Sequence, residues 1–129
     1  NGMPVVKKVT CVVDCGIVVN PLGAKNQIEG GVIDGVGHAM YGDFTFTDGQ
    51  SQSQNFDKYR LIRMGEIPVV ESHLIQNDLA PTGLGEPTLP PAGAAVANAL
   101  KAATGNRFTQ QPFSKYPELM QVPTKAIIG

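Results

Sequence analysis

One carboxylate in the sequence stands in a setting suited to acid–base chemistry. Glu86 follows the run Pro-Thr-Gly-Leu-Gly (81–85) and precedes Pro87. The two glycines let the backbone come close to a bulky ligand, and their amide groups can face an anion. Because a proline fixes the chain directly after it, Glu86 is expected to be held rigidly, as a general base must be. The alternative from these residues alone is that Glu86 serves the start of the following helix electrostatically.

The other reactive residue types do not form a known catalytic or metal-binding pattern. His38 and His73 lie far apart in the sequence, and neither has a partner at metal-ligand spacing, so both are predicted to be ordinary packed or surface histidines. Cys11 and Cys15, if extended, lie about 13 Å apart, whereas a disulfide needs Cα atoms within about 7 Å. Two thiolates also cannot hold an iron–sulfur cluster. We therefore expect two free, buried cysteines and no metal held by side chains.

Composition excludes several classes of function. Charged residues make up 16 % of the 129 residues, and the net charge at pH 7 is -1. Because there is no basic field, a nucleic acid or an anionic membrane is not an expected partner. The sequence has no apolar run of about 18 residues, so we expect no membrane span. A charged fraction below the usual ~25 % suggests that part of the surface is covered by another molecule.

The first residues suggest that the chain belongs to something longer. The sequence opens on Asn1 and enters a strand-like run at once. A natural N-terminus usually begins with Met, so we expect a piece of a larger polypeptide or a processed subunit. In that case the cellular compartment, cytoplasmic or periplasmic, stays open.

The pattern of apolar residues predicts an α+β domain with a small mixed or antiparallel sheet. A Gly-rich helix is predicted over residues 22–41 and an Ala-rich helix over 92–103, with Gly105 beyond its end. Alternation and turn residues, including the hairpin pair Asp48-Gly49, predict strands over 4–14, 43–47, 51–63 and 68–76.

The first of these helices has an unusual composition. Its interior holds four glycines, namely Gly30, Gly31, Gly35 and Gly37. Each costs about 1 kcal/mol relative to alanine in a helix interior. We therefore expect the backbone of this helix to be approached closely by another backbone or by a ligand.

Three motifs, in this order and spacing, resemble the molybdenum-binding subunit of the molybdenum hydroxylases, the xanthine dehydrogenase and aldehyde oxidase family. The resemblance is to the C-terminal part of that subunit, above all in the isoquinoline 1-oxidoreductase beta group. The motifs are Asp-Cys-Gly-Ile-Val-Val-Asn-Pro (14–21), Gln-Ile-Glu-Gly-Gly-Val-Ile-Asp-Gly (27–35) and Gly-Leu-Gly-Glu-Pro (83–87). The resemblance assigns residues 1–108 to part of a larger molybdopterin-binding domain and leaves 109–129 as an irregular tail.

The resemblance implies hydroxylation of an aldehyde or N-heteroaromatic carbon with oxygen derived from water. By motif, Glu86 matches the glutamate that acts as general base. The residues that match cofactor contacts are Gln27, Gly30, Gly31, Thr82, Gly83, Leu84 and Gly85. Helix packing remains the rival explanation for Gly30 and Gly31, and a hydrogen bond in the first helical turn remains the rival for Gln27. Asp14 and Asn20 are expected to be structural, as turn formers.

The resemblance also implies a cofactor and partners. The cofactor is molybdenum-molybdopterin, expected in its cytosine dinucleotide form and bound only in the complete enzyme, with iron–sulfur clusters on other domains or subunits. The expected partners are the remainder of the molybdenum subunit, an iron–sulfur or other electron-transfer subunit, and a small-molecule substrate. The isolated chain is expected to be inactive. The alternative is a non-catalytic cofactor-binding or assembly module that keeps the fold, although the retained Glu86 argues against it.

Overall fold

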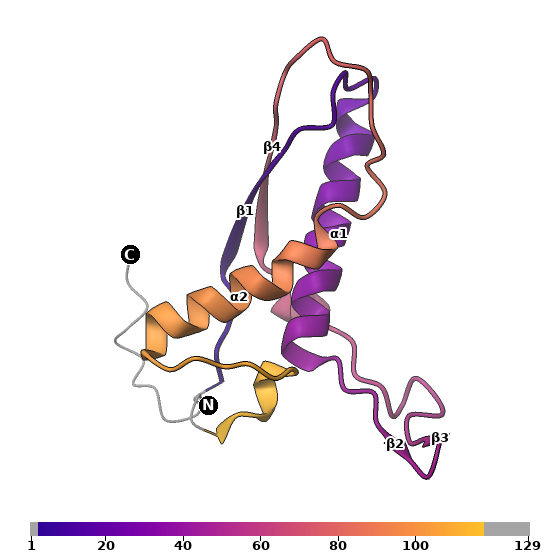
Figure 1. The fold of residues 1–129 in the computed structure, drawn as a ribbon, viewed down its shortest axis with the longest axis vertical. Coiled ribbons are helices and arrows are strands. Elements are labelled where there is room, and N and C mark those ends of the chain that lie inside the picture. The colour runs from indigo at the N-terminus through magenta and orange to yellow at the C-terminus, as the bar shows by residue number, and fades with distance from the viewer. Residues whose placement is uncertain (1–2, 118–129) are drawn as a thin grey trace.

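Two helices cross near the middle of the molecule, and a pair of strands runs beside the longer helix (Figure 1). The structure, a computed structural model, describes residues 3–117. In chain order the elements are β1 (Lys8–Val13), α1 (Pro21–Tyr41), β2 (Phe46–Thr47), β3 (Gln50–Ser51), the 3-10 turn η1 (Met64–Glu66), β4 (Val69–Leu74), α2 (Leu89–Thr104) and the 3-10 turn η2 (Phe113–Lys115).

The β1–β4 pair is parallel, with Lys8 opposite Val69 and Val13 opposite Leu74. Both strands alternate between exposed and partly buried residues, because one face packs on the core and the other meets solvent. Because parallel strands run the same way, both carboxyl ends lie at one edge of the pair. The turn after β1 and the loop after β4 therefore start side by side.

Helix α1 is capped by its sequence and buried along one stripe. The Oδ1 of Asn20 accepts a hydrogen bond from the Gly23 amide at 3.0 Å, and Pro21 occupies the first turn. The largest fully buried side chains of the stripe are Ile28, Val32, Val36 and Met40. Four-residue spacing keeps them on one face, so the predicted helix over 22–41 is confirmed.

The two helices approach closely at the glycines of α1. A Cβ atom on Gly35 would lie 2.6 Å from the Leu89 carbonyl oxygen and 2.7 Å from the Ala92 Cβ, and one on Gly31 would clash with the Thr88 hydroxyl. A Cβ on Gly30 would meet nothing within 4 Å. The predicted close backbone approach is therefore confirmed at Gly35, where it is made by another helix.

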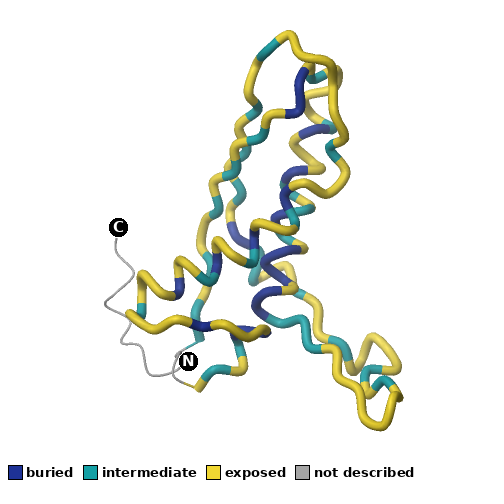
Figure 2. Tube along the Cα trace, in the orientation of Figure 1, coloured by how far each residue is buried: buried dark blue, intermediate teal, exposed yellow. Residues whose placement is uncertain are grey.

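The buried residues gather where the helices cross (Figure 2). The core cluster joins α1 to α2 and to the segment that follows α2, and its members are Val32, Val36, Ala39, Met40, Val96, Leu100, Phe108 and Phe113. Phe113 belongs to this cluster although it lies in the predicted tail. The division of the chain at residue 108 stays a prediction, and residues 118–129 of that tail lie outside the described residues.

The α+β class is confirmed, but the strand arrangement differs from the prediction. The strands of the described chain form two separate pairs, β1–β4 parallel and β2–β3 antiparallel, rather than one sheet. The predicted turn at Asp48-Gly49 is present, with φ of 50° and 76°. The predicted return strand over 51–63 is wrong, because β3 ends at Ser51 and the chain continues through turns. Phe56 in that segment is 83 % exposed, so its side chain has no surface to pack against.

The ends of α2 also follow from its sequence. The helix begins at Leu89 rather than at residue 92, because prolines are tolerated in a first helical turn and Pro90 and Pro91 occupy it. It stops at Gly105, which has a φ of 80° and donates its amide to the Lys101 carbonyl.

We predict that Gly35→Ala destabilises the fold by about 1 to 3 kcal/mol, although alanine is the better helix former. The reason is that the new methyl group must displace the Leu89 carbonyl or Ala92. Urea unfolding measures the change. The matched control is Gly30→Ala, which gains helix propensity without a clash and should be neutral or stabilising by up to about 1 kcal/mol. Equal effects of the two substitutions would contradict the prediction.

Candidate functional site

The site lies where the turn after β1 meets the loop after β4. The Ile17 amide donates to the Leu79 carbonyl at 3.0 Å, and the Thr82 amide donates to the Cys15 carbonyl at 2.9 Å. Gly16 lies between these bonds with a φ of 72°, and a Cβ there would be 2.8 Å from the Leu79 carbonyl oxygen. Only glycine suits this position. The first motif and the loop that leads to the third are thus joined backbone to backbone.

The Asp14 side chain also stabilises this junction between the turn after β1 and the loop after β4. Its Oδ1 accepts hydrogen bonds from the Gly16 amide at 3.1 Å and from the Asn77 Nδ2 at 2.8 Å. These two hydrogen bonds hold the pKa of the Asp14 carboxyl below its ordinary value, and the bond from Gly16 contributes more than the bond from Asn77. Asp14 therefore forms the turn predicted for it and also tethers the start of the loop.

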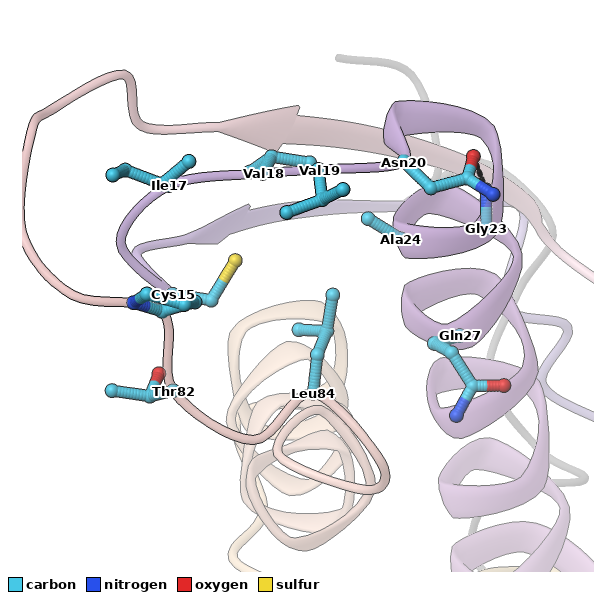
Figure 3. A pocket seen from close by; sticks show the side chains of 11 residues that line it. Cys15, Ile17, Val18, Val19, Asn20, Gly23, Ala24, Gln27, Thr82 and Leu84 are labelled. Carbon is cyan, nitrogen blue, oxygen red and sulfur yellow. Dashed lines mark hydrogen bonds between the residues drawn. The ribbon is translucent and has the colours of Figure 1, made fainter.

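A pocket of about 300 Å³ opens between this turn, the first turns of α1 and the loop (Figure 3). The Cys15 sulfur points into it, and Leu84 reaches toward it from the loop (Figure 3). Its lining residues are Cys15, Ile17, Val18, Val19, Asn20, Gly23, Ala24, Gln27, Pro81, Thr82 and Leu84. Small-molecule pockets range from about 300 to 1,000 Å³, so this one is at the lower limit.

Several residues predicted from the sequence meet here. Gln27, Thr82 and Leu84 line the pocket. The Gln27 Nε2 donates to the Gly85 carbonyl at 3.1 Å, which ties α1 to the loop directly before Glu86. Glu86 itself is exposed and does not line the pocket.

The glycines predicted to contact a cofactor differ in their surroundings. Gly83 and Gly85 have nothing within 4 Å of an added Cβ, and the same holds for Gly30, so their backbones are open to a ligand. Gly31 instead faces Thr88, and helix packing accounts for its missing side chain. The assignment of all four to cofactor binding stays a prediction.

Sequence reasoning missed Thr88. This residue is 4 % exposed, and its hydroxyl donates to the Ile28 carbonyl at 3.1 Å. A threonine just before a helix that opens with prolines is typical of a helix cap, and Thr88 does occupy the N-cap position of α2. Its side chain makes no capping bond there and turns to α1 instead. No local pattern predicts that choice.

Among the remaining reactive groups, Cys15 lines the pocket, whereas Cys11, His38 and His73 do not. Both cysteines are free; Cys15 is buried, Cys11 is partly buried, and burial raises the pKa of Cys11. His38 is half exposed, with Nε2 3.5 Å from Asp34, and His73 lies 4.0 Å from Glu71. Within residues 3–117, no three His, Cys, Asp or Glu side chains come together as a metal site.

Comparison with known proteins gives consistent matches. The profile of the family described as "Molybdopterin cofactor-binding domain" matches residues 1–68. The beta chain of isoquinoline 1-oxidoreductase from Brevundimonas diminuta is 34 % identical over 91 % of this chain and 15 % of that protein. The molybdenum-binding subunit of xanthine dehydrogenase from Escherichia coli O157:H7 is 30 % identical over 84 % of this chain and 15 % of that protein.

Solved structures show the same fold. Quinoline 2-oxidoreductase from Pseudomonas putida 86 superposes with a TM-score of 0.78 at 21 % identity, over 92 % of this chain and 17 % of that one. Aldehyde oxidoreductase from Desulfovibrio gigas gives a TM-score of 0.78 at 26 % identity, over 94 % of this chain and 14 % of that one.

The chain spans only a small part of the relatives that it matches, 15 % of the Brevundimonas protein and 15 % of the Escherichia coli protein. In the part of the chain that the structure describes, neither helix has the length and apolar character needed to cross a bilayer.

We predict that acid loosens the junction held by Asp14. Because its bonds lower the pKa of the folded state, the stability they add is present above the unfolded pKa of about 3.9 and is lost as the pH falls through the lower folded value. Hydrogen exchange should show that protection of the Gly16 amide, corrected for intrinsic exchange, drops below about pH 4. Asp14→Asn, which keeps an acceptor but cannot ionise, should abolish this step.

The control for this experiment is Asp78→Asn, on the same loop, which should keep the acid step. If Asp14→Asn keeps it too, another group controls the junction.

Proposed function

The chain belongs to the molybdopterin cofactor-binding domain family, and from this premise we propose that it is a segment of the molybdenum subunit of a molybdenum hydroxylase. The whole enzyme is an oxidoreductase that hydroxylates an aldehyde or N-heteroaromatic carbon with oxygen from water. The observation that carries the proposal is the convergence of three separate motifs, residues 14–21, 27–35 and 83–87, on one site. A fold kept for structure alone does not require these groups to meet.

The groups at the site fit a pterin cofactor in their chemistry. Gln27 and Thr82 offer an amide and a hydroxyl, and Leu84 offers an apolar contact. Gly30, Gly83 and Gly85 leave open space beside the backbone, where a flat ligand can approach. The proposed cofactor is molybdenum-molybdopterin in its cytosine dinucleotide form, which supplies the redox chemistry when bound.

Glu86 is the proposed general base. Its carboxylate would take the proton from the water-derived oxygen as that oxygen bonds to the electropositive carbon of the substrate, and the hydrogen leaving that carbon would carry its two electrons to the bound cofactor. The position suits this role because the residue is exposed while its backbone is restrained. Pro87 fixes the next φ angle, and the Leu89 amide donates to the Glu86 carbonyl at 3.3 Å.

The remainder of the subunit completes the site under this proposal. The pocket is at the small end of the ligand range, and Glu86 stands outside it in solvent. The arm around β2 and β3 projects from the helices (Figure 1) and exposes Phe44, Phe46 and Phe56. Aromatic residues are enriched in protein interfaces, so this arm packs on other parts of the enzyme. Iron–sulfur clusters and electron transfer belong to other domains or subunits.

We predict that Glu86→Gln in the complete enzyme lowers turnover about 10³-fold while molybdenum stays bound, because a general base and its charge are lost. Turnover of an aldehyde and of an N-heterocycle, together with metal analysis, measures both effects. The matched control is Glu71→Gln on β4, an exposed carboxylate that pairs with Lys8, does not line the pocket and should leave turnover unchanged.

Two results would contradict the proposed enzyme function and favour a non-catalytic cofactor-binding or assembly module instead. One is a wild-type complete protein that binds no molybdenum. The other is a Glu86→Gln variant that turns over normally.

We also predict that the isolated 129-residue chain, supplied with cofactor, has no measurable turnover. Its pocket cannot enclose a pterin without the other domains. Turnover by a pure sample of the isolated chain would contradict the proposed division of the site.

A further inference from the structure

We propose that Thr88 is a positioning residue for Glu86, acting through its hydrogen bond to α1. The inference rests on the proposed function, because it assigns Glu86 the role of base. It adds a residue that lies outside the three motifs and does not touch the pocket.

The hydroxyl of Thr88 is committed to the interior of the molecule. The residue is only 4 % exposed, and its hydroxyl donates to the carbonyl of Ile28, which is itself fully buried. A buried hydroxyl without a partner is costly, so this bond fixes where Thr88 can sit against α1. Thr88 makes no capping bond to α2, so the bond to Ile28 is the contact that its hydroxyl provides.

Gly31 makes room for that hydroxyl. A Cβ on Gly31 would overlap the Thr88 Oγ1, so the space exists only because residue 31 has no side chain. The Gly31–Thr88 contact, here called the lock, therefore fixes the residues just before α2 against α1 in the interior of the molecule.

This lock is separated from the base by a single residue. Pro87 connects Glu86 to Thr88 with a fixed φ angle, and the Leu89 amide closes a bond to the Glu86 carbonyl. On the other side of Glu86, Gly85 is bonded to Gln27. The segments on both sides of the carboxylate are thus tied to consecutive residues of α1, 27 and 28.

The rest of the loop offers little other restraint near the carboxylate. Added Cβ atoms at Gly83 and Gly85 would meet nothing within 4 Å, so no packed neighbour lies on that side of the backbone there. Displacing a catalytic group by about 1 Å can cost about 10²-fold in rate. Loss of the Thr88 bond therefore acts on catalysis through the position of Glu86.

The test compares Thr88→Val with Thr88→Ser in the complete subunit produced with its partners. Valine keeps the shape of threonine and replaces its hydroxyl with a methyl group, and the Ile28 carbonyl remains within the helix, so we expect folding to be retained. We expect Thr88→Val to lower kcat about 10- to 100-fold with KM little changed and molybdenum content equal to wild type. Exchange of the Leu89 amide should become faster in the same variant. Thr88→Ser should restore both kcat and protection.

A double substitution separates the lock from cofactor contact at Gly31. If Gly31→Ala acts by displacing Thr88, its effect on kcat should largely vanish in a Thr88→Ala background. If Gly31 contacts the cofactor, the effect of Gly31→Ala persists in both backgrounds. That result would contradict the proposed role of the Gly31–Thr88 contact.

Other results also overturn the inference. Wild-type kcat in Thr88→Val does so, and so does an equal loss in Thr88→Ser, which would mean that packing and not the hydrogen bond matters. Loss of molybdenum in step with turnover would make Thr88 a residue for cofactor retention. A wild-type complete protein without molybdenum or turnover refutes the proposed function itself, whereas an active wild type with a fully active Thr88→Val variant refutes only this inference.

Discussion

The crossing of α1 and α2 is closer than ordinary side chains permit, and the arrangement of the rest of the molecule depends on it. At Gly35 the backbone of one helix takes the place that a side chain would need on the other. Because α2 is held there, the long connection from β4 must run past the first half of α1 to reach it (Figure 1). The loop with Glu86 therefore lies beside the turn after β1, where the pocket forms.

The four interior glycines of α1 serve two purposes, helix packing and an open stretch of backbone. On propensity alone each disfavours the helix by about 1 kcal/mol. Gly31, Gly35 and Gly37 face Thr88, Leu89 and Ile62, so close packing offsets their cost. Gly30 has no such neighbour and lies on the exposed side of the helix. Three positions thus serve the fold, and the fourth leaves an open strip of backbone for the proposed ligand.

Local patterns were enough to predict the helices and the hairpin turn. Apolar spacing in α1, proline and glycine at the ends of α2, and the Asp48-Gly49 pair each act within a few residues. The predicted return strand over 51–63 failed because alternation becomes a strand only when a partner and a packed face exist. The parallel pairing of β1 with β4 could not be predicted either, because the two strands are far apart in the sequence and helix α1 lies between them.

The candidate site likewise has features that sequence motifs predict and features that only the folded chain shows. Motif resemblance singled out Glu86, Gln27 and the loop residues, and the structure brings Gln27 into contact with Gly85. Thr88 escaped notice because its role arises from a hydrogen bond between residues 60 positions apart. Sequence patterns therefore indicate which groups do chemistry more readily than which groups hold them in position.

The parallel β1–β4 pair also sets an order of events during synthesis. Thr10 and Glu71, which face each other in the pair, are 61 residues apart in the chain. At about 5 to 20 residues per second, β1 waits roughly 3 to 12 s on the ribosome before its partner is made. Helix α1 is synthesised within that interval, whereas α2, whose packing offsets the cost of the α1 glycines, follows only after β4. The nascent chain thus presents an unpaired strand edge before its partner exists, which is the kind of surface that chaperones protect.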